Sequence, residues 1–254
     1  MVTSARSQGH AGLFIAAFND IEAWFRRDLR RDQFAHFAEM ARVYAARHHL
    51  PSAQLDELLD FAALRNAISH GKYYGGRPIA EPTEEVVRDI ERLREQILSP
   101  PLVLDLLEER QVCVTGPDEP ISAVLEHVVR FDYSQVPVYS EASYVGLLTT
   151  NAVARWLARQ FELNQGLAEG EPVRRVLAFA ESHERARLAG RTITAAEAIY
   201  HLTHSGRGRA PVPALIVTEG SEPAGRPLRM ITGSDLPALS AKLGIGITGP
   251  SAGI

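Results

Sequence analysis

The sequence predicts a multidomain protein of α and α+β class: an N-terminal four-helix bundle, then two β-α-β-β-α repeats packed as a pair. Three observations lead to this fold class. Apolar residues recur at helical spacing through roughly the first hundred residues. Ser99-Pro100-Pro101 then breaks that pattern. Beyond the break, one succession of short strands and helices occurs twice, about 75 to 80 residues apart, and an internal repeat outweighs any single motif.

Apolar stripes define the four helices, and we interpret each stripe as core. In chain order the stripes are Leu13, Phe14, Ala17, Phe18, Ile21, Trp24, Phe25 and Leu29; Phe34, Phe37, Ala38, Ala41 and Tyr44; Leu55, Leu58, Leu59, Ala62 and Ile68; and Val86, Val87, Ile90, Leu93 and Ile97. Pro51-Ser52 opens the third helix, and Gly71 suits its end. Pro82-Thr83-Glu84-Glu85 opens the fourth, with acidic residues at the positive end of the helix dipole.

The repeated unit predicts strand, helix, two strands and helix. The first copy places these at 112–114, 121–130, 136–139, 144–148 and 151–160, and the second at 191–193, 195–203, 214–218, 228–231 and 234–241. Because a unit this small cannot bury both faces of its sheet alone, we expect the two copies to pack on each other. The expected boundaries are 11–98 for the bundle, 102–162 and 172–241 for the repeats, and 242–254 for a flexible tail.

Composition restricts the class of protein. The chain has 254 residues, 45% hydrophobic and 23% charged, with a net charge of −4 and a pI near 6.1, which argues against a general nucleic-acid coat protein but allows a local basic site. Its single cysteine, Cys113, excludes an intrachain disulfide and fits a reducing compartment. No run approaches the ~20 apolar residues of a membrane span, and the first ten residues are polar. We therefore expect a cytoplasmic protein without a membrane partner.

Three sequence words recur in both copies in the same order. They are Pro120-Ile121-Ser122-Ala123-Val124, Val136-Pro137-Val138-Tyr139 and Val145-Gly146-Leu147-Leu148-Thr149, then Thr194-Ala195-Ala196-Glu197-Ala198, Pro213-Ala214-Leu215-Ile216-Val217 and Met230-Ile231-Thr232-Gly233-Ser234-Asp235. Over residues 102–241 the chain resembles paired CBS domains, or Bateman modules. This resemblance implies a cleft between the copies for a regulatory adenosyl ligand such as AMP, ATP or S-adenosylmethionine.

In that family a Thr or Ser grips phosphate and an Asp three places later grips ribose, and Thr232 and Asp235 keep this pattern. Gly233 allows close backbone approach, and Ser234 and Pro213 lie within the same words. In the first copy Ala152 stands at the acid position, so we expect one competent site and one weak or empty site. Arg209 either supplies a cation that contacts phosphate or belongs to a solvated loop. The alternative for Thr232 and Asp235 is capping of the last helix, which uses the same geometry.

Arg65, Asn66 and His70 lie late in the third helix, and this motif in a short bundle resembles the HEPN family over 11–98. Many HEPN proteins are metal-independent ribonucleases, so the resemblance implies catalysis without a cofactor. A histidine near neutral pKa transfers the 2′-hydroxyl proton, a guanidinium braces the phosphorane, and Asn66 orients phosphate or imidazole. Residues five apart on a helix differ by about 140°, so Arg65 and His70 converge within one subunit only if the helix ends at Ser69. We therefore favour a site shared across a homodimer axis.

Two functions from different classes remain open. The first is an adenine-nucleotide sensor whose HEPN-like domain is an endoribonuclease acting on RNA at a dimer interface, regulated by the adenosyl ligand. The second is a non-enzymatic regulator in which the helical domain only dimerises or docks a partner. Arg65 then pairs with Asp56, Glu57 or Asp60, and His70 caps the helix. We expect no metal site, because no acid or cysteine completes the His201 and His204 pair.

Overall fold

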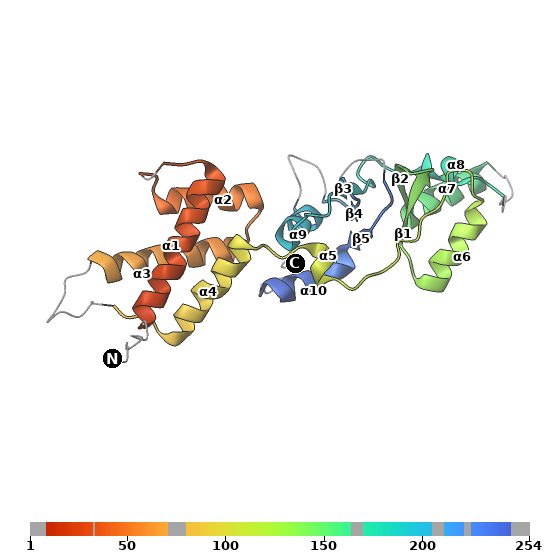
Figure 1. Ribbon diagram of the computed structural model, residues 1–254. Coiled ribbons are helices and arrows are strands. Elements are labelled where there is room, and N and C mark those ends of the chain that lie inside the picture. The colour runs from red at the N-terminus through yellow and green to blue at the C-terminus, as the bar shows by residue number, and fades with distance from the viewer. Residues whose placement is uncertain are drawn as a thin grey trace, which may run out of the picture. The chain divides into compact units, whose positions relative to one another are not determined.

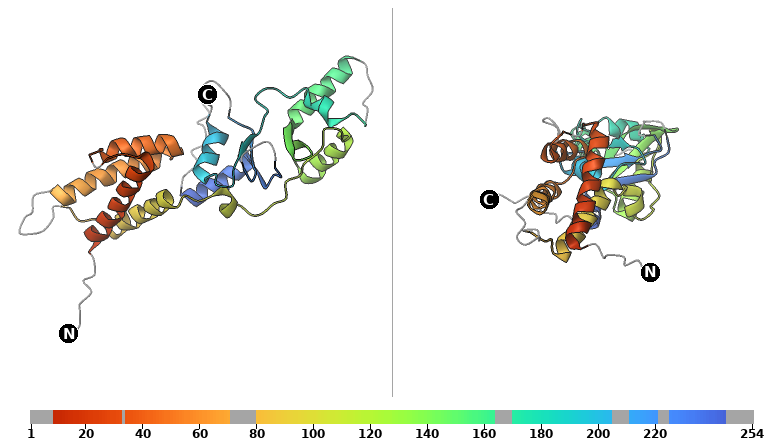
Figure 2. Two further views of the ribbon diagram at one scale, coloured as in Figure 1. Left: turned by 45° about the horizontal axis from the view of Figure 1, so that its top comes forward. Right: turned by 60° about the vertical axis from the view of Figure 1, so that its left-hand side comes forward.

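The computed structural model describes residues 9–32, 34–70, 80–163, 170–204, 211–220 and 225–244. The chain divides into two units: the helices up to Pro101 belong to one, and Leu102–Lys242 form the other. Figures 1 and 2 show the elements of each unit. Several residues considered above lie outside the described ones: Gly71, Arg209 and the tail from 245 onwards.

Four helices of the first unit pack around a shared apolar core: α1 (His10–Leu29), α2 (Phe37–His48), α3 (Ser52–His70) and α4 (Glu84–Leu98). Helix α1 contacts each of the other three, and α2 also packs on α3. The expected start of α4 is observed, because the Thr83 hydroxyl accepts a hydrogen bond from the Val86 N–H at 3.3 Å. Phe34 was wrongly included in the second helix: α2 begins at Phe37, and Phe34 is 78% exposed.

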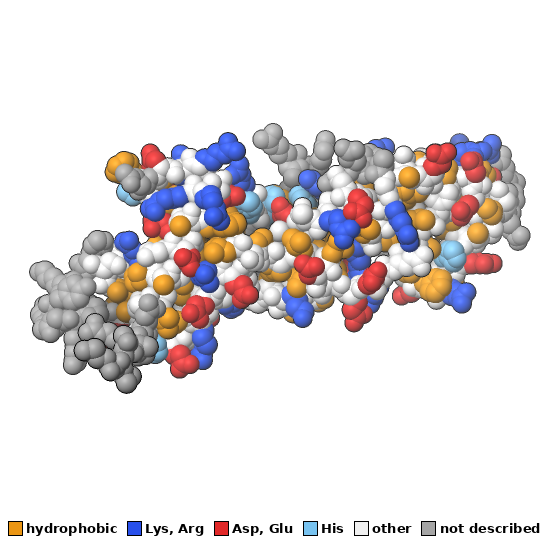
Figure 3. Space-filling model, viewed as in Figure 1, with side chains coloured by type: hydrophobic (Ala, Val, Ile, Leu, Met, Phe, Trp, Pro, Cys, Tyr) orange, Lys and Arg blue, Asp and Glu red, His pale blue; other side chains and the backbone are white. Residues whose placement is uncertain are grey.

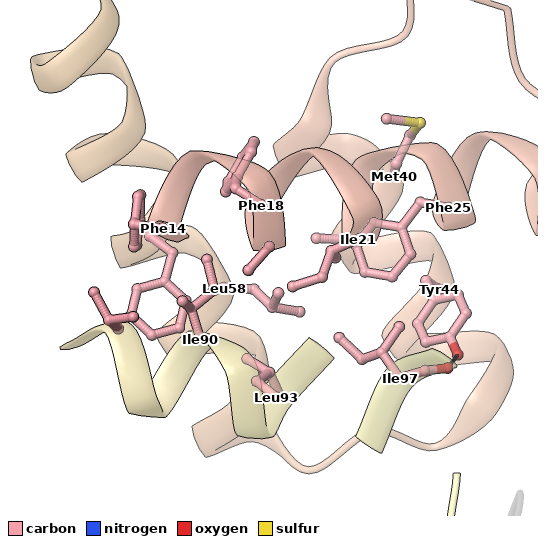
Figure 4. Packing of buried hydrophobic residues seen from close by; sticks show 14 of the residues in the cluster. Phe14, Phe18, Ile21, Phe25, Met40, Tyr44, Leu58, Ile90, Leu93 and Ile97 are labelled. Carbon is pink, nitrogen blue, oxygen red and sulfur yellow. Dashed lines mark hydrogen bonds between the residues drawn. The ribbon is translucent and has the colours of Figure 1, made fainter. Parts of the chain in front are cut away.

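Aromatic rings pack around aliphatic side chains such as Leu58 in this first core (Figure 4). Phe14 meets Phe61 edge to face, Phe18 lies against Phe37, and Phe25 lies against Tyr44 with ring centroids 4.5 Å apart. The buried Tyr44 hydroxyl donates to the Ile97 carbonyl at 3.3 Å. Such rings contribute large buried areas to a small core, and a buried hydroxyl is tolerated where it has a partner.

The second unit contains two similar halves. The first half has α6 (Ile121–Phe131), β1 (Gln135–Ser140), β2 (Ser143–Thr149) and α7 (Thr150–Glu162), with β1 and β2 antiparallel. The second half has β3 (Arg187–Ala189), α9 (Ala195–Thr203), β4 (Ala214–Val217), β5 (Arg229–Thr232), a 3₁₀ turn (Gly233–Asp235) and α10 (Leu236–Leu243). Its sheet has the order β3-β4-β5, with β3 parallel and β5 antiparallel to β4.

Two short helices are exchanged between the halves. Helix α5 (Val103–Leu106) precedes the first half but contacts α9 of the second, with the Val103 N–H donating to the Ile193 carbonyl at 3.1 Å. Helix α8 (Val173–Leu177) precedes the second half but packs on β2 and α7 of the first, with the Val173 N–H donating to the Glu119 carbonyl at 2.9 Å. The exchange links each half to the other.

The predicted first strand was wrong in both copies. Residues 112–114 form no strand, and only Thr115 bridges Val138, because Gly116-Pro117 follows at once and proline cannot continue a ladder. In the second copy the strand is Arg187–Ala189, and 191–192 form a turn that the Ile193 N–H closes on the Gly190 carbonyl at 3.1 Å. Ile193 is apolar because it is buried beside α5, not because it belongs to a strand.

The last predicted helix begins slightly later than expected. Gly233–Asp235 form a 3₁₀ turn, and α10 covers Leu236–Leu243. Pro237 lies in the first turn of α10, where its missing N–H has no intrahelical partner to lose.

Candidate functional site

A cavity of about 220 Å³ in the second unit brings together parts of both halves. Strand β5 and the 3₁₀ turn contribute one wall, and the chain at 110–113 and 132–135 contributes the other. Three of the predicted ligand residues line it: Thr232, Ser234 and Asp235. Gly233 and Pro213 are not among the lining residues, and Arg209 lies outside the described residues.

The Asp235 carboxylate is held at both oxygens. Oδ2 accepts a hydrogen bond from the Thr232 N–H at 2.9 Å, and Oδ1 accepts one from Nη2 of Arg229 at 3.0 Å. A carboxylate has about four lone-pair positions, so each oxygen keeps one position for a further donor. The carboxylate therefore caps the turn and remains able to accept from two hydroxyl groups.

Two hydroxyl groups lie next to this carboxylate. The Thr232 and Ser234 oxygens are 2.8 Å apart, and Ser234 is exposed at the cavity. Both are small neutral groups that can donate to an anion. The wall thus combines a carboxylate acceptor with hydroxyl donors, the combination that ribose and phosphate require.

Arg229 is a lining residue that the sequence analysis missed. Its side chain is only 7% exposed, and Nη1 donates to the Glu108 carbonyl at 2.8 Å in addition to the contact with Asp235. Its Nε is buried and has no hydrogen-bond partner among the described residues. The internal repeat contains a signal for this residue. The pairing of β1 with β2 and of β4 with β5 makes Arg229 the counterpart of Gly146, so the second copy has an arginine where the first has a glycine.

Gln135 also lines the cavity, and its amide has a fixed orientation. Its Nε2 donates to the Pro213 carbonyl at 3.2 Å. Because a carbonyl only accepts, this contact assigns Oε1 to the other side of the amide. That Oε1 is buried and has no partner among the described residues.

The counterpart of Thr232 in the first half is already occupied. The Thr149 hydroxyl donates to Glu184 at 2.8 Å and also caps α7 by accepting from the Ala152 N–H at 3.0 Å. Arg155 contacts the second oxygen of Glu184, which also accepts from the Glu181 N–H at 2.8 Å. Ala152 has no carboxylate, and Glu184, which is remote in sequence, accepts from the Thr149 hydroxyl instead.

The surroundings of Glu184 favour its charged form. Burial by itself raises the carboxyl pKa, but the Glu181 N–H, the Thr149 hydroxyl and the Arg155 guanidinium together hold the pKa below its ordinary value. The Glu184 side chain is 5% exposed, so the carboxylate is a buried, fully partnered anion.

In the first unit, helix α3 runs through His70 and does not end at Ser69. Arg65 and His70 are therefore five positions apart on one helix, and backbone positions five apart are separated by about 140° around the helix axis. The Arg65 guanidinium lies 5.8 Å from the Phe18 ring centroid and contacts Asn66 Oδ1 at 3.4 Å. It forms no ion pair with a carboxylate among the described residues, and Glu57 pairs with Arg92 instead.

A cationic surface lies over the end of α1 and over α2, where Figure 3 shows basic side chains, all of them arginines, with acidic groups between them. Ion pairs join Arg26 to Glu22 at 2.9 Å and Arg47 to Asp28 at 3.4 Å. This face is therefore mixed in charge and a weak candidate for tracking phosphates.

Comparisons with known proteins give matches at the level of structure. No family model and no curated relative matches the chain. Solved structures that resemble it include CBSX2 in complex with AMP, at 16% identity and a TM-score of 0.42, covering 57% of this chain and 98% of that one. CbpB in complex with c-di-AMP has 15% identity and a TM-score of 0.43, covering 61% and 93%.

The CBS domain pair of MJ0100, solved with 5′-methylthioadenosine and S-adenosyl-L-methionine, has 13% identity and a TM-score of 0.41, covering 56% of this chain and 96% of that one. The structures with folds similar to this chain thus include CBS domain pairs. No helix of the described residues has the length and apolar character that a membrane crossing requires.

Proposed function

We propose that the chain is an adenine-nucleotide sensor that binds an adenosyl ligand in the cavity beside Asp235. The observation that carries this proposal is the cavity wall itself, which holds Thr232, Ser234 and Asp235 together. The CBS-like sequence words predicted these residues as ribose and phosphate contacts, and their side chains share one cavity.

The ligand's ribose meets Asp235 in this proposal. The 2′- and 3′-hydroxyl groups each donate to one carboxylate oxygen, using the two lone-pair positions that Thr232 N–H and Arg229 leave open. Phosphate lies toward the Thr232 and Ser234 hydroxyl groups, which are 2.8 Å apart. Hydrogen bonds to charged groups are stronger than neutral ones, so these contacts supply most of the specificity.

One ligand binds per chain. The Thr149 hydroxyl of the first half is committed to Glu184, and Ala152 provides no acid. A second nucleotide phosphate there would have to displace a buried carboxylate that has three partners of its own: the Thr149 hydroxyl, the Arg155 guanidinium and the Glu181 N–H. The stoichiometry therefore follows from the difference between the halves.

Calorimetry with AMP, ATP and S-adenosylmethionine tests the proposal. Asp235→Ala removes the ribose acceptor and should weaken the best ligand about tenfold or more. Asp118→Ala, which removes an exposed carboxylate away from the lining, should bind like the wild type. Unchanged affinity in Asp235→Ala, or no binding by the wild type, would refute the site.

We further propose that Arg65, Asn66 and His70 form half of a metal-independent ribonuclease site completed by a second copy of the chain. The favouring observation is that the Arg65 guanidinium has no carboxylate partner among the described residues, although acidic residues are frequent on α3. A cation left without an acid partner is available to a phosphodiester.

The coupling between the two units is part of the same proposal. Nucleotide binding changes how two subunits pack and so aligns or separates the two copies of the motif. Such coupling requires that the ligand bind one arrangement more tightly than the other. The rival function keeps the nucleotide site but makes the helical unit a dimerisation or docking module.

Labelled RNA distinguishes these functions. Wild-type protein is incubated with RNA in EDTA, with and without AMP or ATP, beside Arg65→Ala and His70→Ala. The nuclease function is supported if the wild type cleaves RNA and both variants do not. The control is His183→Ala, which replaces an exposed histidine in the second unit and should retain cleavage. No cleavage under any ligand would leave the docking function.

A further inference from the structure

The chain between α8 and β3 is anchored to the first half, although it leads into the second. Residues 178–186 form this segment, which contains turns but no helix or strand. Phe179 packs against the apolar core of the first half, and its carbonyl accepts from Arg155 Nε at 2.8 Å. At the other end the Ala186 N–H donates to the Tyr144 hydroxyl at 3.1 Å. We call this segment the strap, because both of its ends are tied to one half.

The middle of the strap places the Glu184 carboxylate among three donors. Oε1 accepts from the Thr149 hydroxyl at 2.8 Å. Oε2 accepts from the Glu181 N–H at 2.8 Å and contacts the Arg155 guanidinium. The donors come from the end of β2, from α7 and from the strap itself. One cation and two neutral donors thus converge on a side chain that is only 5% exposed, and such surroundings stabilise an ionised carboxylate.

We propose that the first half contains a carboxylate-binding site and that the chain fills it with its own Glu184, so that the strap is a tethered ligand. Much of the site is built without Glu184. Thr149 is fixed because its hydroxyl also caps α7, accepting from the Ala152 N–H at 3.0 Å. Arg155 is fixed because its Nε donates to the Phe179 carbonyl. A small free carboxylate should therefore occupy the same position once the Glu184 side chain is shortened.

The chemistry of the donors favours a carboxylate over a phosphate. Three donors serve two oxygens, and Arg155 supplies the one positive charge among them. A phosphate group brings more charge and further acceptor oxygens, for which these three donors provide no partner. The Arg155 side chain is 34% exposed, so the site lies next to the surface, and a small anion can reach it when Glu184 no longer fills it.

The tether makes the first half unresponsive to free anions. An intramolecular ligand has a high effective concentration, so free anions at ordinary concentrations cannot displace it. In the second half, by contrast, the Thr232 hydroxyl contacts Ser234, and both residues line the cavity. The strap also continues directly into β3, so the filled site holds the first strand of the second half's sheet to the first half. This inference goes beyond the proposed nucleotide site and does not depend on it.

Thermal unfolding of the full chain in sodium acetate and in sodium chloride of equal ionic strength tests the proposal at neutral pH. A Trp24→Phe background makes Trp156 fluorescence report the second unit. Glu184→Ala should unfold about 2–4 °C higher in acetate than in chloride, because acetate binds the folded form at the vacated position. The wild type should show no such difference, and Glu184→Ala combined with Arg155→Gln should lose it together with the cation.

Glu181→Ala is the matched control, because it removes a half-exposed acid 3.9 Å from the same arginine and leaves Glu184 in place. It should respond to acetate as the wild type does. Equal acetate responses of Glu184→Ala and the wild type would overturn the proposal.

Hydrogen exchange in the wild type provides a second measurement. The Glu181 and Ala186 amides should exchange about tenfold or more slowly than the amide of the exposed Ser182, because both have partners that hold the strap in place. If Glu184→Ala is unfolded in both salts, this measurement decides the matter. Protection of the two amides supports the tethered ligand, and exchange as fast as that of Ser182 overturns it.

Discussion

The Thr149 hydroxyl donates a 2.8 Å hydrogen bond to Glu184, a residue 35 positions further along the chain. In the other half the corresponding residue, Thr232, donates its backbone N–H to Asp235, only three positions away, while its hydroxyl contacts Ser234. Each threonine thus has an acid, and each acid has an arginine: Arg155 for Glu184 and Arg229 for Asp235. In the first half a remote acid accepts from the threonine hydroxyl, and in the second half a neighbouring acid accepts from the threonine backbone N–H.

Removing the charge of Glu184 should destabilise the second unit. Glu184→Gln leaves Arg155 without its buried partner, and we expect a loss of about 1–3 kcal/mol in the free energy of unfolding, measured by urea titration. Glu181→Gln changes a half-exposed acid 3.9 Å from the same arginine and should cost less than about 0.5 kcal/mol. Equal losses for the two variants would contradict the assigned role of Glu184.

Glu184 should also make the free energy of unfolding depend on pH in a defined direction. Its pKa is lowered in the folded chain, so its stabilisation is complete above the unfolded pKa of about 4.3 and is lost as pH falls through the lower folded value. The difference in unfolding free energy between wild type and Glu184→Gln should therefore be constant near neutral pH and shrink below about pH 4.5. A difference that grew on acidification would have the wrong sign.

Removing the side-chain hydroxyl should affect stability differently at Tyr139 and Tyr144. The Tyr139 hydroxyl is buried without a partner among the described residues, and burial first and Tyr144 second raise its pKa to about 12. Tyr139→Phe should therefore be neutral or stabilising. The Tyr144 hydroxyl accepts from the Ala186 N–H at 3.1 Å, so Tyr144→Phe should cost about 1 kcal/mol. Thermal unfolding of both variants measures the contrast.

A side chain at Gly146 should require the Leu177 side chain to shift. A Cβ built at Gly146 would lie 3.0 Å from Cδ2 and 3.2 Å from Cδ1 of Leu177 on α8. Gly146→Ala should therefore cost about 1–3 kcal/mol through overpacking. In a double-mutant cycle, Leu177→Ala should recover part of this loss, and strictly additive losses would show that the two sites are independent.

The two tryptophans allow the first core to be tested separately. Trp24 lies in the first unit and Trp156 in the second, so a Trp156→Phe background makes fluorescence report the helical unit. In that background Leu58→Ala, at a fully buried position, should cost about 2–5 kcal/mol. Phe34→Ser, at a position 78% exposed, should shift the urea midpoint little. Similar shifts for both would exclude Leu58 from the core.

Local sequence patterns predicted the helices well because each pattern depends on neighbours in the chain. Thr83 and Thr194 both cap helices near the expected positions, and the Thr194–Glu197 capping box is complete. The prediction failed at Ile193, where an apolar residue resembled a strand. Ile193 is buried beside α5, whose residues lie far earlier in the sequence. A local pattern around Ile193 cannot show this contact.

The candidate nucleotide site was predicted in part for the same reason. Thr232 and Asp235 are three residues apart on a turn, so a short motif specifies them. Gln135 and Arg229 come from different halves, and their place in the cavity depends on how the halves pack. A comparison of the two copies position by position would have singled out Arg229 opposite Gly146.

The sequence by itself determined the helical first part, the repeated second part and the threonine–aspartate pair that caps the last turn. The tertiary structure decided which threonine remains open to a ligand, because Glu184 reaches Thr149 only after the chain folds back across α7. It also decided which polar atoms are left without partners. Patterns along the chain reflect short-range geometry, whereas a buried donor or acceptor finds its partner, or lacks one, through long-range packing.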